Sequence, residues 1–287
     1  MKRFCVIANH DKDENYQKAQ YISRYLEQRG GVCYVPANEK DMQDGICHFT
    51  NVEEIPQNTQ CAIVLGGDGT MIQAAIDLVH RNLPILGINI GTVGFLTEVE
   101  EQKLEWALDL LLRDEYKTQD RIMLRAALPR QSEGEDFCYA LNDVVLSKRG
   151  SCRLVTIKVY INDELADIYR ADGLIVSTPT GSTGYNLSAG GPVMVPHAKA
   201  TVITPICAHS LNKRSLVVSA KDKITLELGQ TKDFQEDTAV LTVDGRNVRE
   251  LTTGCKIHIC IPRDKTQLIK LSDVSFYKRM RDKLNGN

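Results

Sequence analysis

The chain has 287 residues, enough for two domains with a sizeable core, and its 35 Lys and Arg nearly balance its 37 Asp and Glu. We find no block of like charge and no apolar run near the roughly 18 residues of a membrane helix, so we expect neither nucleic acid nor a membrane as partner. The apolar run 4–8 is too short for a signal peptide, which predicts a cytoplasmic protein. Nine scattered cysteines without a C-x-x-C pair argue against a disulfide framework and a zinc site.

Short apolar runs alternate with helical patterns in the first third of the chain. We expect strands over residues 3–8, 32–35, 61–66 and 84–89, and helices over residues 16–29, 71–81 and 101–112. Gly30 and Gly31 should end the first helix. This repeated βα order predicts an α/β domain with a Rossmann-like parallel sheet, whose ligands gather beyond the carboxyl ends of the strands.

The sequence Gly66-Gly67-Asp68-Gly69-Thr70 lies at such an end, between the apolar run 61–65 and a helical stretch. Its glycines would permit positive φ angles and a close backbone approach, and N–H groups at a helix start attract anions, so the turn predicts phosphate binding. A carboxylate there would repel phosphate, so Asp68 is better suited to take a proton from an attacking hydroxyl or to help hold a metal ion. A plain glycine-rich connection with a solvated Asp stays open on this pentapeptide alone.

Strand-like alternation dominates after the helix at 101–112. The clearest runs are residues 154–161, 216–218, 224–228 and 240–243, separated by polar or turn-forming pieces as in an antiparallel sandwich. We therefore expect an α/β domain over residues 1–115 and a mainly β sandwich domain over residues 116–287, with the boundary near Glu115. A short basic helix over residues 276–284 closes the chain, and its apolar face could pack back on the first domain.

The stretch 172–186, DGLIVSTPTGSTGYN, is unusually rich in small hydroxyl residues. Five Ser and Thr side chains on a glycine-flexed loop could meet the edges of a base and the oxygens of a sugar, and Tyr185 adds an aromatic face. The alternative is a run of turns with local hydroxyl-to-backbone bonds. Asn142 and Asp143 form an amide and carboxylate pair before the apolar residues 144–146, although such a pair by itself is more often a turn.

Taken together and in this order, these motifs resemble those of the NAD kinase family, which phosphorylates the 2′-hydroxyl of the adenosine ribose of NAD. The resemblance runs from GGDGT at Gly66 through NIGTVGFLTEV, LNDVVL, DGLIVSTPTGSTGYNLSAGGP and TPICAHSLNKRSLVV to VDGR, which begin at Asn89, Leu141, Asp172, Thr204 and Val243. Lipid kinases and phosphofructokinase-like enzymes carry sequences similar to GGDGT, so the specific part is TPTGSTGY in a β-rich second domain.

The resemblance implies a set of nucleotide-binding residues from both predicted domains: Gly67, Asp68, Gly69, Phe95, Asn142, Asp143, Arg170, Asp172, Thr180, Thr183, Tyr185, Ser188, Cys207 and Asp244. Asp68 matches the catalytic base, while the glycine amides beside it would hold the donor's phosphates. Asn142 and Asp143 match the pair that grips the adenosine of NAD.

Further roles also follow from the resemblance. Thr180, Thr183 and Tyr185 match the adenine-pocket loop, and Phe95 matches an aromatic wall for the base. Asp172 matches a residue that contacts the nicotinamide side across a subunit interface, and Cys207 lies in a segment that lines the same region. The chain departs from common family residues at three positions: Asp143 replaces Glu, Gly184 replaces Ala, and Cys207 replaces a small apolar residue.

The implied reaction uses NAD and ATP as substrates, with Mg²⁺ or another divalent cation, and inorganic polyphosphate is a second possible donor. We assign no metal ligand. The sequence has no Walker A motif, no H-R-D, and no G-x-G-x-x-G after its first strand, so NAD is expected as substrate rather than as hydride carrier. The family forms dimers and tetramers, which predicts a homodimer or homotetramer.

Two other functions stay open on the residues alone. The first is a lipid or sugar kinase that shares the GGDGT turn. The second is a dinucleotide sensor without catalysis, against which Asp68 argues, because binding alone needs no base beside phosphates.

Overall fold

The computed structural model describes residues 1–9, 12–35, 41–43, 46–48, 50–91, 94–129, 135–150, 154–210, 212–231 and 237–284. The chain divides into two compact units, one of Met1–Arg121 with Lys265–Asn287 and one of Ile122–Asp264. No helix in the described part of the chain is long and apolar enough to cross a membrane.

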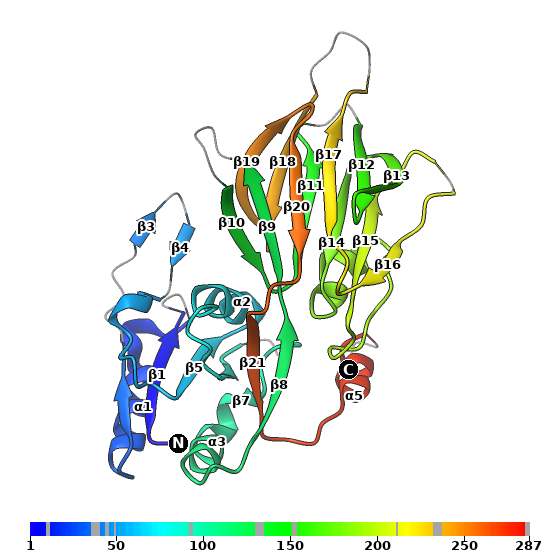
Figure 1. Ribbon diagram of the computed structural model, residues 1–287. Coiled ribbons are helices and arrows are strands. Elements are labelled where there is room, and N and C mark those ends of the chain that lie inside the picture. The colour runs from blue at the N-terminus through cyan, green and yellow to red at the C-terminus, as the bar shows by residue number, and fades with distance from the viewer. Residues whose placement is uncertain are drawn as a thin grey trace. The chain divides into compact units, whose positions relative to one another are not determined.

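The first unit is built on a sheet with the strand order β2-β1-β5-β6-β21-β8, in which β7 also pairs with β6 (Figure 1). The pairs β1–β2, β1–β5, β5–β6, β6–β7 and β6–β21 are parallel, which confirms the expected α/β architecture. Its strands are β1 Arg3–Ala8, β2 Val32–Tyr34, β5 Cys61–Gly66, β6 Ile85–Asn89, β7 Val99–Glu100, β8 Lys117–Ile122 and β21 Lys265–Lys270. Every residue of β5 and β6 is buried, as in a parallel sheet covered on both faces.

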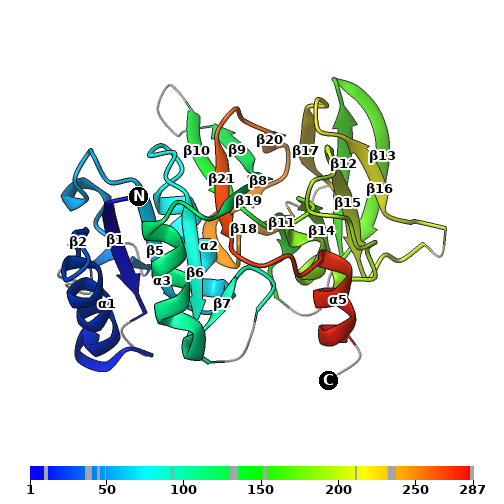
Figure 2. The same ribbon diagram turned by 90° about the horizontal axis from the view of Figure 1, so that it is seen from below.

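Helices cover both faces of this sheet. α1 (Gln17–Glu27) and α3 (Leu104–Leu112) share one apolar cluster with alternate residues of β1, β5 and β6, and Figure 2 shows both helices on the same side. α2 (Asp68–Asp77) packs on the opposite face, where a Cβ on Gly87 would lie 2.7 Å from Sδ of Met71. As expected, two glycines follow the end of α1: Gly30 has φ +78°, and Gly31 N donates to Leu26 O.

Short elements complete the first unit. A hairpin of β3 (Asp41–Gln43) and β4 (Ile46–His48) lies in the stretch between β2 and β5. The 3₁₀ turns are η1 Glu14–Tyr16, η2 Val52–Glu54 and η3 Glu101–Lys103.

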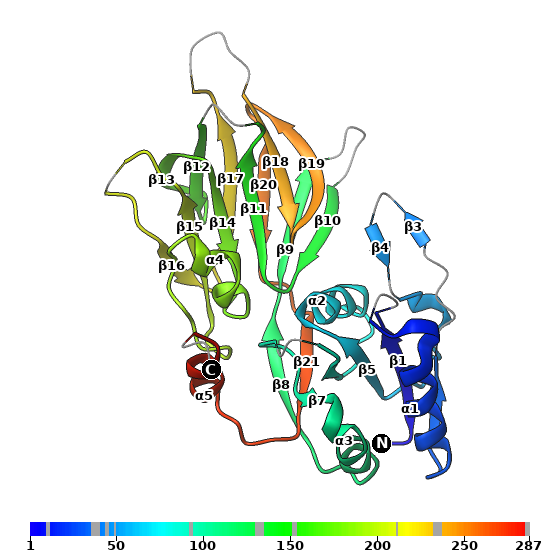
Figure 3. The same ribbon diagram turned by 180° about the vertical axis from the view of Figure 1, so that it is seen from behind.

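The second unit is a sandwich of two antiparallel sheets, as expected (Figure 3). One sheet has the order β10-β9-β20-β17-β12-β13 and the other β16-β15-β14-β11-β18-β19, and buried side chains from both form one core. The strands of the first are β9 Leu124–Pro129, β10 Glu135–Ala140, β12 Val155–Ile161, β13 Glu164–Ala171, β17 Ile224–Gly229 and β20 Lys256–Cys260. Those of the second are β11 Asp143–Lys148, β14 Gly173–Ser177, β15 Ala200–Ile206, β16 Leu216–Ser219, β18 Thr238–Val243 and β19 Arg246–Thr252, and η4 (Gly181–Thr183) and α4 (Tyr185–Ser188) follow β14.

The division between the units differs from the boundary that we expected near Glu115. The last strand, β21, pairs with β6, so the chain returns to the first unit at Lys265 instead of ending in the sandwich. The helix expected at 276–284 is α5 (Phe276–Leu284), and it also belongs to the first unit. Its Arg279 donates hydrogen bonds to the carbonyl oxygen of Thr97 and to Glu98.

Candidate active site

The glycine turn of the first unit connects β5 to α2, as the sequence predicts. Gly67 has extended backbone angles and stands just before the helix, so the first N–H groups of α2 have no acceptor within the helix and are available to an anion. Our expectation of positive φ angles in the turn was wrong, because Gly66, Gly67 and Gly69 have none. Gly66 is required for another reason: a Cβ there would lie 2.3 Å from Oγ1 of the buried Thr70.

Asp68, the first residue of α2, is held in place by a loop that follows β6. Its carboxylate accepts hydrogen bonds from the backbone N–H of Phe95 at 2.7 Å and of Leu96 at 3.0 Å. The approach is possible because residue 94 is glycine. Two N–H donors use only part of the capacity of a carboxylate, so Asp68 retains lone pairs that can accept a proton from a substrate hydroxyl.

Sequence reasoning missed Lys12, which lies after β1 and carries no motif. Its Nζ would lie 3.3 Å from a Cβ on Gly67 and 3.4 Å from a Cβ on Gly91, so the ammonium group faces both glycines. The side chain is exposed at the turn that should bind phosphate. Nothing in the sequence around Lys12 distinguishes it from other surface lysines, and only the fold brings it to the turn.

A second group of polar residues gathers at the start of β11 in the second unit. The carboxylate of Asp244 accepts hydrogen bonds from three consecutive backbone N–H groups at this strand start, those of Leu141, Asn142 and Asp143, at 2.7, 2.9 and 2.8 Å. Asp244 therefore fixes the backbone that presents Asn142 and Asp143. Burial and the charge of Asp244 raise the pKa of Asp143 to about 7, and burial raises that of Asp244 too, against the effect of the three N–H donors.

The hydroxyl-rich loop wraps around Asn142. Thr178 N donates to Asn142 O at 2.8 Å, and a Cβ on Gly184 would lie 3.8 Å from Asn142 Nδ2. Three of the five hydroxyl side chains are fully buried and donate to backbone carbonyl groups: Ser177, Thr178 and Ser182. This corrects the expectation that all five could contact a ligand.

The residues of this loop that we expected to bind nucleotide lie nearer its surface, with one exception. Thr180 is buried, with 8% of its surface exposed. Thr183 is half-buried and donates to Thr180 O at 3.3 Å. Tyr185 is 48% exposed at the start of α4, and Ser188 is exposed at its end.

Arg170, Asp172 and Cys207 form a third group, where β13 passes into β14 beside the end of β15. Asp172 N donates to Ile206 O at 2.9 Å, and its carboxylate pairs with Lys148 at 2.7 Å. Cys207 is exposed and has φ +46°. Among the described residues, no hydrogen bond or ion pair joins this group to Asn142, so the structure gathers the second unit's candidates into two groups rather than one.

An aspartate-containing glycine turn in an α/β unit, together with a second polar group in a β sandwich, is typical of a kinase without a P-loop. Comparisons with known proteins narrow this class. Residues 4–116 match the family model of the ATP-NAD kinase N-terminal domain, and residues 141–271 match that of the ATP-NAD kinase C-terminal domain.

Relatives that match over the full length of the chain are also NAD kinases. The chain is 43% identical over 285 residues to the NAD kinase of Lachnoclostridium phytofermentans, with 99% of both chains covered, and 40% identical over 288 residues to that of Agathobacter rectalis, with 100% of this chain and 99% of the relative covered. The chain belongs to the NAD kinase family.

Two solved structures share the fold. The yeast NADH kinase complexed with NADH matches with a TM-score of 0.85 at 21% identity, covering 100% of this chain and 88% of its own. The NAD kinase from Archaeoglobus fulgidus in complex with ATP matches with a TM-score of 0.74 at 23% identity, covering 99% and 97%.

Proposed function

We propose that this protein transfers the γ-phosphate of ATP to the 2′-hydroxyl of the adenosine ribose of NAD and so makes NADP. The observation that carries the proposal is the position of Asp68. A carboxylate held by two backbone N–H groups at the start of a helix would only weaken a turn that merely binds phosphate. The same carboxylate is useful where a hydroxyl must lose a proton as it attacks phosphorus.

In the proposed reaction, Asp68 accepts the proton of the 2′-hydroxyl while that oxygen attacks the γ-phosphorus. The N–H groups of the first turn of α2 hold the donor's phosphates, and the ammonium group of Lys12 places a positive charge beside these phosphates. These groups position the donor and offset its charge, which is most of what phosphoryl transfer requires of a protein.

A divalent cation fits this turn only with help from the donor. Within the described residues, no group of three His, Cys, Asp or Glu side chains could hold a metal ion, whereas Mg²⁺ is commonly held by one or two carboxylates together with substrate phosphates and water. Asp68 is the carboxylate at the turn that could contribute. The ion would supply neutralisation of the phosphate charge. ATP is the proposed donor, and polyphosphate is the alternative that an assay must compare.

NAD would be held by the second unit. Asn142 presents an amide to the adenine edge and Asp143 a carboxylate to a ribose hydroxyl, with Thr180, Thr183, Tyr185 and Ser188 around them. Asp244 holds the backbone of this group in place, because its carboxylate accepts hydrogen bonds from three backbone N–H groups there. Phe95 of the first unit would pack against the base, and Arg170, Asp172 and Cys207 would serve the nicotinamide side, with Asp172 acting across the interface of a homodimer or homotetramer.

The assay that tests the proposal supplies the purified chain with NAD, Mg²⁺ and either ATP or polyphosphate, and detects NADP with a dehydrogenase specific for NADP. Lipid and sugar alcohols replace NAD in parallel reactions. Formation of NADP supports the proposal. Phosphorylation of a lipid or sugar without NADP would favour the rival kinase, and tight NAD binding with no transfer from any donor would favour a sensor.

A further inference from the structure

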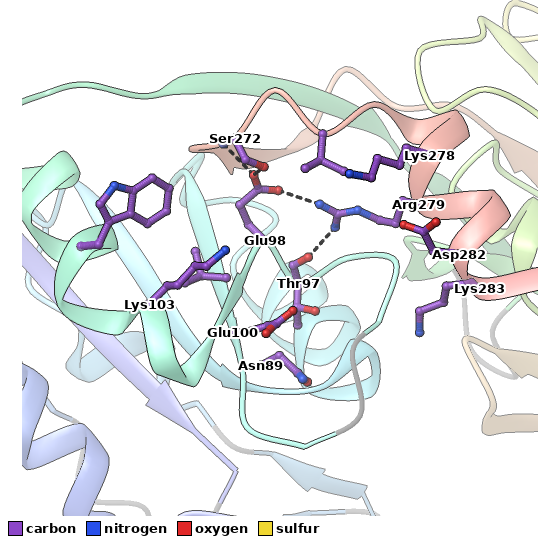
Figure 4. Close-up of a pocket in the computed structure, with 13 residues that line it drawn as sticks. Asn89, Thr97, Glu98, Glu100, Lys103, Ser272, Lys278, Arg279, Asp282 and Lys283 are labelled. Atoms are coloured by element: carbon purple, nitrogen blue, oxygen red, sulfur yellow. Dashed lines mark hydrogen bonds and ion pairs between the residues drawn. The ribbon is translucent and has the colours of Figure 1, made fainter. Parts of the chain in front are cut away.

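A pocket of about 670 Å³ lies in the first unit and is lined by Asn89, the strand partner of Gly66 at the start of the glycine turn. It is lined by the end of β6, by residues 97–100, by Lys103 and Trp106 near the start of α3, and by α5. Figure 4 shows Lys103 on one side of the pocket and Lys278 and Lys283 of α5 on the other, with Thr97 and Glu98 between them. Among the described residues, neither Asp68 nor the glycines of its turn line this pocket, whose volume is typical of small-molecule sites.

Positive charge prevails around the pocket. Its lining residues carry four positive and three negative charges: Lys103, Lys278, Arg279 and Lys283 against Glu98, Glu100 and Asp282. The carboxylate of Glu98, 1% exposed, lies between Lys270 and Arg279 and also accepts from Ser272 Oγ at 2.7 Å. Lys103 and Lys278 form no ion pair within the described part of the chain. An anionic group entering the pocket would offset this excess.

The pocket also offers one aromatic face and one unused acceptor. Trp106, the single tryptophan of the chain, lines it and is 44% exposed. Asn89 is 3% exposed and donates from Nδ2 to Gly91 O at 2.6 Å, but its Oδ1 is buried without a hydrogen-bond partner among the described residues. A buried unpaired oxygen is costly, and a ligand that brings an amino or hydroxyl group would satisfy it.

We propose that this pocket is a second ligand site, which binds a nucleoside monophosphate. The phosphate would lie among the lysines and Arg279, the base would stack on Trp106, and an amino or hydroxyl group of the nucleoside would donate to Asn89 Oδ1. This combination suits a nucleotide better than a simple anion, which leaves the indole and the amide unused. The proposal goes beyond the kinase activity and does not require it.

The single tryptophan allows a direct test on the full chain. Tryptophan fluorescence, excited where tyrosine does not absorb, reports on Trp106 alone. The probe is guanosine 5′-monophosphate, whose base differs from the adenine that the second unit should recognise. We expect a saturable change with this nucleotide, and a weaker or absent response to guanosine alone and to inorganic phosphate alone.

Charge reversal locates the site. The double variant Lys103→Glu and Lys278→Glu should weaken binding of the nucleotide by about tenfold or more. Both positions lie at or near the first turn of a helix, where an acidic residue is tolerated, and thermal melting checks the fold. The matched control is Lys221→Glu, an exposed lysine of the second unit, which should bind as the wild type does.

Three further variants keep the test decisive. Asp68→Asn and Asn142→Ala should bind the nucleotide as the wild type does, which separates this proposal from the kinase mechanism. Trp106→Leu, followed by calorimetry, should bind more weakly. The proposal is overturned if the wild type shows no saturable change, if the double variant binds as tightly as the wild type, if phosphate alone binds as tightly as the nucleotide, or if Asn142→Ala abolishes the signal.

Discussion

Gly94 leaves the space that the carboxylate of Asp68 occupies, because a Cβ at position 94 would lie 1.7 Å from Oδ1 of Asp68. The next two residues, Phe95 and Leu96, donate their backbone N–H groups to the same carboxylate. The loop after β6 thus fixes the position of the proposed base, and Gly94, 26 positions away from Asp68 in the chain, belongs to the proposed active site.

Gly94→Ala should therefore displace the Asp68 carboxylate and lower kcat for NADP formation by about tenfold to a hundredfold, since small misplacements of a catalytic group are costly. The comparison variant is Gly69→Ala, whose Cβ would meet no protein atom within 4 Å and would therefore leave Asp68 in place. Because the added methyl group lies in the turn proposed to hold the donor's phosphates, it should raise KM for ATP and leave kcat unchanged. Equal kcat values for Gly94→Ala and the wild type would contradict the positioning of Asp68 by this loop.

Lys12→Gln should raise KM for ATP and leave KM for NAD unchanged, because the ammonium faces the glycines of the proposed donor site. Lys12 is exposed and therefore screened by solvent, so we expect a rise of about tenfold at low salt and a smaller rise at high salt. Steady-state kinetics with each substrate varied in turn provide the measurement. Lys2→Gln, an exposed lysine beside Gly30, is the control, and a change in KM for NAD alone would reassign Lys12 to the acceptor.

If Asp143 binds NAD as proposed, its pKa, raised to about 7, should make NAD binding depend on pH near neutrality. If a ribose hydroxyl donates to the ionised carboxylate, affinity for NAD should rise as the pH increases through about 7 and then level off. Calorimetric titration of NAD between acidic and alkaline pH measures this directly. Asp143→Asn should bind NAD without that dependence, whereas an unchanged profile in the variant would assign the titration to another group.

The same raised pKa also affects stability. The folded protein holds the Asp143 proton more tightly than the unfolded chain does, so this contribution is present below the unfolded pKa near 4 and is lost as the pH rises through about 7. Asp143→Asn should consequently raise the melting temperature more at alkaline than at acidic pH, which checks the pKa shift without any substrate.

Much of the site could be predicted from residues that are adjacent in sequence. The turn between β5 and α2, the strand start at Asn142 and Asp143, and the helix at 276–284 follow from local patterns of apolar, glycine and polar residues. Contacts between distant segments could not be predicted in this way. Lys12 and Gly94 have their roles only because the sheet brings their loops to the turn.

The same limit explains two expectations that the structure modified. Residues 265–270 have a strand pattern, but a pattern does not say which sheet a strand joins, and β21 joins the first unit. Hydroxyl side chains can face a ligand or their own backbone with equal ease, and Ser182, which donates to Pro179 O at 2.6 Å, faces the backbone.

The interface role of Asp172 is tested by mixing two impaired chains. In this structure its carboxylate pairs with Lys148 of the same chain, so a role across an interface would require it to serve both. If it does, Asp68→Asn and Asp172→Ala chains that exchange subunits should regain part of the activity, because one site of each hybrid dimer combines an intact Asp68 with an intact Asp172. Mass spectrometry verifies exchange, and kinetics verify that Asp172→Ala alone is impaired. Mixtures no more active than the sum of the separate variants would confine Asp172 to its own subunit's site.

The most direct measurement is the rate of NADP formation by Asp68→Asn, together with its affinity for NAD. Asn keeps the shape and its single amide oxygen can still accept from the N–H group of Phe95 or of Leu96, but it lacks the basic oxygen that must take the 2′-hydroxyl proton. General-base catalysis is typically worth about 10²–10⁴-fold, so kcat should fall by that factor while the Kd for NAD, measured by calorimetry, stays within about threefold of wild type. A loss of kcat below about tenfold, or an equal loss in NAD affinity, would contradict the assignment of Asp68 as the base.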